Sequence, residues 1–210
     1  MVYMSMFDDI ECSYPAADDA MIGAAEQALS ARLPSDYKAF LRTHNGGFAR
    51  EFRYTFLTGV PFKQGEIYNP SREDCVVELF GIPAATSSGR QPMGLVETAA
   101  VHRAERFLPT SIIAVASCVQ SSLVCMSLRQ CDHGTIYYWE YYWRYPWCKE
   151  FFDERIEDAR ARMKDDRGDI KGAADVELAS FDALNFATLV RIAPSFSEWS
   201  QSCFDGTDAT

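Results

Sequence analysis

The sequence predicts one domain in which helices come first and the strands of a largely antiparallel sheet follow. Residues 18–31 and 34–44 repeat apolar side chains at helical spacing. From residue 52 onward, runs rich in β-branched and aromatic residues, bounded by Gly and Pro, are typical of strands. The links at residues 118–122 and 129–134 are short enough for hairpins, which join antiparallel strands.

The two expected N-terminal helices have recognisable ends. Asp18 or Asp19 is a candidate N-cap for the first helix, and Pro34 suits the first turn of the second. The second helix should end at Asn45-Gly46-Gly47, because glycine adopts the left-handed conformation that a C-cap needs. The periodic positions of the two helices are Ile22, Ala25 or Glu26, Leu29, Tyr37, Phe40, Leu41 and His44.

The rest of the chain is expected to alternate strands with a few helices. Ser195 and Glu198 form a capping box that begins a last helix, with Phe196, Trp199 and Cys203 on one face. Residues 149–167 are expected to form a highly charged helix with a narrow apolar stripe. A weaker helix is expected at 94–107, and strands are expected at 52–58, 74–80, 111–116, 123–128, 135–142 and 188–193.

The composition predicts a cytoplasmic protein that binds neither membranes nor nucleic acid. The chain has a net charge of −10, and an acidic surface repels phosphate backbones. It contains no run of about 18 apolar residues, and its N-terminus lacks the features of a secretory signal. The seven cysteines, an odd number without a C-x-x-C motif, fit a reducing compartment, and Cys125 and Cys148 lie in apolar stretches typical of buried thiols.

No catalytic residue, metal site or cofactor is expected. His44, His102 and His133 do not have the spacing of metal ligands, and phosphate-binding glycine motifs do not occur. Cys131-Asp132-His133 contains the residue types of a nucleophilic relay, but adjacent side chains diverge and cannot assemble one. We interpret this stretch as a polar hairpin turn before Gly134.

Several segments, in order, resemble the SUKH superfamily, the Smi/Knr-like domain. The first is LPSDYKAFLRTHNGG, residues 33–47, preceded by the I-x-x-x-E-x-x-L pattern of Ile22, Glu26 and Leu29. LFGIP at 79–83, LPTSIIAVA at 108–116, LVCMSL at 123–128 and GTIYYWE at 134–140 match the successive strands. IAPSFSEW at 192–199 resembles the closing strand and helix, so the resemblance spans roughly residues 18–204.

The resemblance implies an α+β fold: a single domain with a mostly antiparallel central sheet flanked by helices. Residues 18–210 would form this domain, with the charged helix around 149–167 as an insertion and residues 1–17 as an acidic N-terminal extension. Many bacterial members resemble immunity proteins, which bind and neutralise a cognate toxin that is often a nuclease or a deaminase. Fungal members are regulators that bind other proteins. The family implies no shared catalytic residues, so we expect a non-enzymatic binding domain.

The sequence IYYWEYYWRYPW, residues 136–147, is the most aromatic segment of the chain. We expect Tyr137 to Trp139 to lie in the core of the sheet. Pro146 forbids a central strand position, so the residues around it should lie near a rim, as a surface patch or covered by the inserted helix. The candidate partner-binding anchors are Tyr142, Trp143, Tyr145 and Trp147.

Acidic residues are concentrated at the N-terminus. Residues 1–31 contain six acidic residues and no Lys or Arg. These charges suit a basic protein partner, which they would steer into contact. The candidate steering residues are Asp8, Asp9, Glu11, Asp18 and Asp19. Three alternatives stay open: a regulatory or scaffold module for a cellular protein, an enzyme with an unfamiliar site, and a homodimer formed through the aromatic rim.

Overall fold

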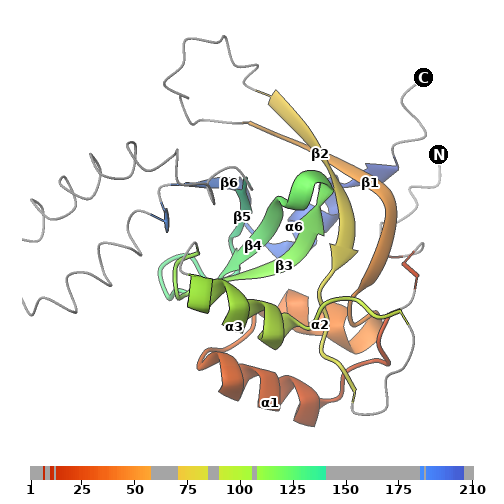
Figure 1. Cartoon of the computed structure of the whole chain (residues 1–210), viewed down its shortest axis with the longest axis vertical. Coiled ribbons are helices and arrows are strands. Elements are labelled where there is room, and N and C mark those ends of the chain that lie inside the picture. Colours follow the sequence, from red (N-terminus) through yellow and green to blue (C-terminus); the bar gives the residue numbers. More distant parts are fainter. Residues whose placement is uncertain are drawn as a thin grey trace, which may run out of the picture.

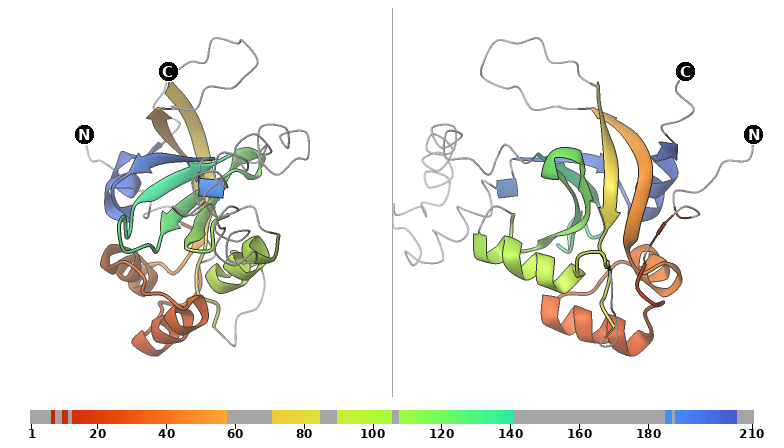
Figure 2. Two further views of the ribbon diagram at one scale, coloured as in Figure 1. Left: turned by 90° about the vertical axis from the view of Figure 1, so that its left-hand side faces the viewer. Right: turned by 45° about the vertical axis from the view of Figure 1, so that its right-hand side comes forward.

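Seven antiparallel strands form one sheet with helices around it. The computed structural model describes residues 7, 10–11, 13–57, 71–84, 90–105, 108–140, 185–186 and 188–205. Within them the strand order is β6-β5-β4-β3-β2-β1-β7. Strands β1 to β6 are neighbours both in the chain and in the sheet, which confirms the predicted α+β fold. Helices α1 and α2 lie at one end of the sheet, and α3 and α6 lie on opposite sides of it (Figures 1 and 2).

The elements lie close to the expected ranges. The helices are α1 (Asp19–Leu29), α2 (Ser35–Thr43), α3 (Leu95–Glu105) and α6 (Phe196–Ser202), with a 3₁₀ turn η1 (Val119–Ser121). The strands are β1 (Gly47–Leu57), β2 (Ser71–Leu79), β3 (Ile112–Cys118), β4 (Leu123–Ser127), β5 (Ile136–Trp139), β6 (Leu189–Ala193) and β7 (Phe204–Asp205). Strand β7 was not predicted. The expected helix at 149–167 lies outside the described residues.

Three predicted helix ends are confirmed, whereas Pro34 directly precedes α2 instead of lying in its first turn. The carboxylate of Asp18 accepts the backbone N–H of Met21 at 2.8 Å and caps α1. Asn45 and Gly46 follow α2 with φ angles of 50° and 80°, in the left-handed region that turns the chain into β1. Ser195 caps α6 by accepting the backbone N–H of Glu198 at 3.2 Å.

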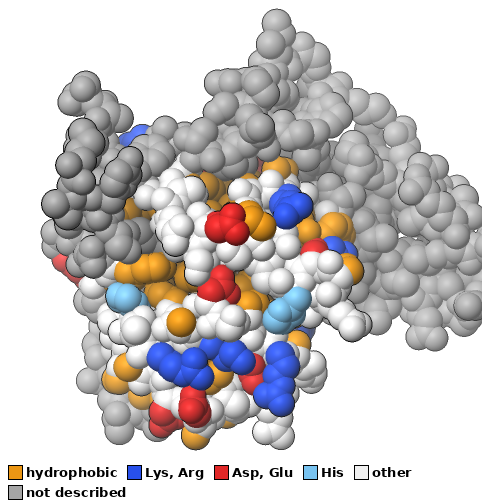
Figure 3. Space-filling model, turned by 180° about the vertical axis from the view of Figure 1, so that it is seen from behind, with side chains coloured by type: hydrophobic (Ala, Val, Ile, Leu, Met, Phe, Trp, Pro, Cys, Tyr) orange, Lys and Arg blue, Asp and Glu red, His pale blue; other side chains and the backbone are white. Residues whose placement is uncertain are grey.

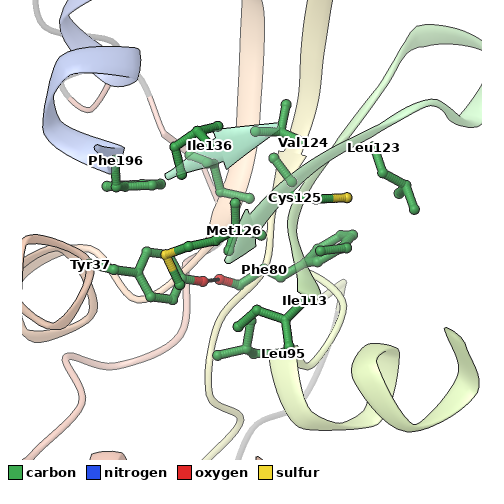
Figure 4. Packing of buried hydrophobic residues seen from close by; sticks show 14 of the residues in the cluster. Tyr37, Phe80, Leu95, Ile113, Leu123, Val124, Cys125, Met126, Ile136 and Phe196 are labelled. Atoms are coloured by element: carbon green, nitrogen blue, oxygen red, sulfur yellow. Dashed lines mark hydrogen bonds between the residues drawn. The ribbon is translucent and has the colours of Figure 1, made fainter. Parts of the chain in front are cut away.

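The core joins both sides of the sheet to the two N-terminal helices. Tyr37 of α2, Leu95 of α3 and Phe196 of α6 are each at most 1% exposed. Figure 4 shows Leu95 beside Ile113 of β3, and the Tyr37 hydroxyl directed at Phe80. Tyr37 donates to the carbonyl oxygen of Phe80 at 3.0 Å, which ties α2 to the end of β2.

Strand β5 is buried and the sheet curves around it. The expected core position of Tyr137 to Trp139 is confirmed, since all three residues are buried. Tyr138 donates a hydrogen bond to Asp74 of β2 at 2.7 Å, although β4 and β3 separate the two strands. Neighbouring strands are about 4.8 Å apart, so a flat sheet would place β5 and β2 roughly 14 Å apart. The sheet must therefore curve until the Tyr138 side chain reaches Asp74.

Candidate partner-binding surface

The four aromatic residues expected to anchor a partner, Tyr142, Trp143, Tyr145 and Trp147, lie outside the described residues. The structure locates the two ends of the chain segment that carries them. Trp139 of β5 pairs with Leu189 of β6, so the described chain leaves after Glu140 and resumes at the same end of this strand pair. Strand β6 is an edge of the sheet. The chain therefore enters the aromatic segment from the end of β5, the strand next to β6.

The acidic residues expected to steer a partner have different structural roles. Asp8 and Asp9 lie outside the described residues. Glu11 exchanges two backbone hydrogen bonds with Phe48 of β1, at 2.9 and 2.8 Å. Asp18 caps α1, and Asp19 forms an ion pair with Arg42 at 2.8 Å, with both side chains exposed. Only Glu11, Asp18 and Asp19 are thus located, and the charge of Asp19 is partly balanced.

The surface of α1 and α2 carries charges of both signs. Figure 3 shows Lys and Arg side chains gathered beside Asp and Glu side chains in the lower part of the molecule, where Figure 1 places these helices. Arg32, Lys38 and Arg42 supply the cations, and Glu26 and Asp19 are their partners. A uniformly acidic face is therefore absent from the described part of these two helices.

Glu26 is a buried carboxylate. The helical spacing alone did not decide whether Ala25 or Glu26 lies on the buried face. Its oxygens accept hydrogen bonds from Arg32 at 2.6 Å, from the backbone N–H of Leu33 at 2.9 Å and from Lys38 at 3.2 Å. Burial by itself raises the pKa of this carboxyl, but the three donors outweigh burial and lower the pKa to about 2. Glu26 therefore joins α1 to the start of α2 as a charged structural residue.

Asn45, within the Asn-Gly-Gly segment, is completely buried and joins three parts of the chain. Its amide donates to the carbonyl oxygens of Pro15 and Ile82, at 2.6 and 3.0 Å, and accepts the backbone N–H of Ile82 at 2.8 Å. Gly46 and Gly81 allow this close approach, because a Cβ on Gly81 would lie 2.3 Å from the Asn45 carbonyl oxygen. Asn45 therefore holds the end of α2 against Pro15 and Ile82.

The Cys131-Asp132-His133 stretch is the turn between β4 and β5, as predicted. Asp132 accepts hydrogen bonds from Ser127 Oγ at 2.7 Å, from Arg129 Nε at 2.9 Å and from the Tyr137 hydroxyl at 2.6 Å. Burial opposes ionisation of this carboxyl, but these donors, Arg129 foremost, hold its pKa well below the usual value. His133 Nε2 lies 2.8 Å from the carbonyl oxygen of Arg32 and must donate to it.

Burial disfavours the thiolate form of the buried cysteines that the structure describes. Burial raises the pKa of Cys118 and Cys125, and it raises the pKa of Cys203 to about 12. The expected burial of Cys125 is confirmed, whereas Cys148 lies outside the described residues. Among the residues that the structure describes, His, Cys, Asp and Glu do not form a group of three that could hold a metal ion.

Comparisons with known proteins agree with this fold. In the described part of the chain, no helix has the length and hydropathy of a membrane span. No curated protein matches the chain. The family model described as SMI1 / KNR4 family (SUKH-1) matches residues 16–160, which include α1 to β5 and the Asn45 and Gly81 junction. The chain therefore belongs to the SMI1 / KNR4 family (SUKH-1).

Proposed function

We propose that this chain is a non-enzymatic protein-binding domain of the immunity type, which binds and neutralises a cognate toxin of the nuclease or deaminase class. One observation carries the proposal. The residues on which the family resemblance rests, among them Tyr37, Asn45, Gly46 and Gly81, are engaged in holding the fold together. These residues therefore build the scaffold of the domain, and a partner would be recognised by side chains on its surface.

The proposed mechanism is stoichiometric occlusion. A toxin that acts on nucleic acid is expected to be basic, and the chain has a net charge of −10. Complementary charge raises the association rate from about 10⁵–10⁶ M⁻¹s⁻¹ towards 10⁸–10⁹ M⁻¹s⁻¹ at low salt. Buried aromatic anchors then slow dissociation. We assign the steering to Asp8, Asp9, Glu11, Asp18 and Asp19, and the anchoring to Tyr142, Trp143, Tyr145 and Trp147.

The chemistry of the candidate nucleophiles supports a binding role. Cys118, Cys125 and Cys203 are kept as thiols by burial, and Asp132 and His133 are engaged in the hairpin turn. The acidic net charge disfavours a nucleic-acid partner and favours a basic protein. The position of the chain in the cytoplasm belongs to the same proposal, since that is where it would meet an incoming toxin.

A pull-down of the tagged protein from its native lysate, at low and at high salt, tests the proposal. Capture of one basic protein that kills cells when it is expressed alone, and is harmless when co-expressed with this chain, would support it. Faster loss of that protein at high salt would support the electrostatic part. Capture of a non-toxic cellular protein would instead favour a regulatory or scaffold module, and a self-associated species without another partner would favour a homodimer.

Two pairs of substitutions test the assigned residues on the captured partner. Trp143→Ala with Trp147→Ala should raise the dissociation rate by about 1,000-fold, because aromatic anchors contribute about 2 kcal/mol each when buried and every 1.4 kcal/mol is a factor of about ten. Asp8→Asn with Asp9→Asn should lower the association rate at low salt and change dissociation little. Asp165→Asn with Asp166→Asn is the matched control for net charge, and an equal effect from this pair would refute local steering.

A further inference from the structure

A small apolar patch lies on β2 and its neighbours. Three of the large hydrophobic side chains exposed in the described residues belong to it: Val77 of β2 is 41% exposed, Met93 is 49% exposed and Val119 of η1 is 47% exposed. Val76 pairs with Cys118, the last residue of β3, so η1, which begins with Val119, starts directly beside β2. Figure 1 shows the green turn that joins β3 to β4 lying next to β2. We call Val77, Glu78, Met93 and Val119 the Glu78 patch.

The patch is built on fixed backbone. The β2–β3 register shifts between Val76 and Glu78, so Val77 is an extra residue in a bulge. Adjacent side chains of a strand face opposite sides of the sheet, so Val77 is exposed where Val76 is buried. On the other side, the carbonyl oxygen of Met93 accepts the N–H of Gly81 at 3.2 Å, and the N–H of Met93 donates to Glu78 Oε1. Met93 is thus held against the end of β2.

Glu78 is a half-buried carboxylate in the middle of these apolar side chains. Its oxygens accept from the Met93 N–H and, at 3.5 Å, from Ser117 Oγ. Burial is the main influence on this carboxyl and raises its pKa, while the charge of Arg90 opposes that rise. The guanidinium carbon of Arg90 lies over the ring of Phe48, 4.2 Å from its centre, in a cation–π contact. A carboxylate has about four acceptor sites, and the donors from Met93 and Ser117 fill two of them, so Glu78 can accept further hydrogen bonds from a partner.

We propose that the Glu78 patch is a docking site for a Lys or Arg side chain that is flanked by apolar side chains on a protein partner. The charge of Glu78 complements such a cation, and Val77, Met93 and Val119 supply the apolar contacts that exclude water around it. Arg and Met are enriched at interface centres, and apolar contacts that exclude water strengthen a charge pair relative to one at an exposed rim. The inference rests on the proposed function, and it adds a contact surface on β2 to the aromatic residues assigned as anchors.

A short peptide tests the patch without a known partner. The probe is acetyl-Leu-Arg-Leu-amide, and the control is the same peptide with Gln in place of Arg. Amide chemical shifts of the full chain are recorded by NMR while either peptide is added to millimolar concentration. We expect the Arg peptide to shift the amides of Val77, Glu78, Met93 and Val119 together, and the Gln peptide to bind about tenfold more weakly. Absence of shifts at the patch, or equal binding of both peptides, would overturn the proposal.

Variants separate the patch from other surfaces. Glu78→Gln should weaken the Arg peptide by about tenfold and leave the Gln peptide unchanged. Val77→Ser with Val119→Ser should weaken both peptides. Val101→Ser is the matched control, because Val101 of α3 is 46% exposed but lies outside the patch. Exposed substitutions of this kind change stability little, so these variants should fold. An effect of Val101→Ser as large as that of the valine pair would overturn the assignment.

The same variants distinguish a failure of this inference from a failure of the proposed function. If a captured toxin binds Val77→Ser with Val119→Ser as tightly as it binds the natural chain, the toxin-binding role stands and the patch is not its contact. If no toxin is captured but the Arg peptide shifts the patch, the patch stands as a protein-binding site and the toxin-binding role fails.

Discussion

Replacing Asn45 with alanine tests whether the Asn-Gly-Gly segment stabilises the fold through the hydrogen bonds of Asn45 or only through its turn. Asn45 makes three hydrogen bonds, to the carbonyl oxygens of Pro15 and Ile82 and from the N–H of Ile82. The side chain is 0% exposed, so the alanine variant leaves three backbone groups without these bonds in the interior. Each orphaned group costs about 1–3 kcal/mol. At the low end of that range, the loss is about 3 kcal/mol.

The backbone adds a second contribution. Asn45 has a φ angle of 50°, and an alanine in the left-handed region costs about 1 kcal/mol more than a glycine. Asn45→Ala should therefore lower the free energy of unfolding by about 4 kcal/mol, and Asn45→Gly by about 3 kcal/mol. Both are large parts of the 5–15 kcal/mol that is typical of a folded domain.

Urea unfolding at pH 7, followed by far-ultraviolet circular dichroism, measures both variants. With a slope of about 2 kcal/mol per molar urea, the midpoint should fall by about 2 M for Asn45→Ala and about 1.5 M for Asn45→Gly. A loss below about 1 kcal/mol for Asn45→Ala would refute the hydrogen-bond argument, since even one orphaned group costs that much. Equal midpoints for the two variants would refute the backbone contribution alone.

Three further predictions follow from the interior. Gly81→Ala should lower the free energy of unfolding by about 3 kcal/mol, because its Cβ would lie 2.3 Å from the Asn45 carbonyl oxygen, and the melting temperature checks this. Glu26→Gln should cost about 2 kcal/mol at pH 7. Folding lowers the pKa of Glu26 from about 4.5 to about 2. The stability that the Glu26 carboxylate contributes is therefore present above pH 4.5 and is lost as the pH falls towards 2. The urea midpoints of the natural protein and Glu26→Gln should converge over that pH range. Iodoacetamide should label exposed Cys131 in the native protein but Cys118, Cys125 and Cys203 only after unfolding, as peptide mapping would show. Native labelling of these three would contradict their burial.

Local signals in the chain predicted most elements, because each depends on neighbouring residues. The N-cap at Asp18, the stop at Asn45-Gly46-Gly47 and the capping box of Ser195 and Glu198 involve contacts within a few positions. Strand β7, Phe204–Asp205, escaped prediction because two residues have no periodicity and become a strand only by pairing with β1.

Local sequence patterns do not predict why Glu26 is buried as a charged residue. Helical spacing placed either Ala25 or Glu26 on the buried face, and both are buried in the structure. A buried carboxylate is stable only with donors, and those donors come from Arg32, Leu33 and Lys38 after the chain has turned into α2. The sequence could not assign this role, because it depends on how two helices meet.

By itself, the sequence determined the order of helices and strands, their hairpin connections and the family, since these follow from periodicity, caps and turn residues. Tertiary structure alone decided which of two adjacent valines is exposed. Val76 is buried and Val77 is 41% exposed, because adjacent strand residues face opposite sides of the sheet and the packing of the whole domain decides which side is the core. It also decided that Tyr138 reaches Asp74 across two strands, because the curvature of a sheet depends on all its strands together.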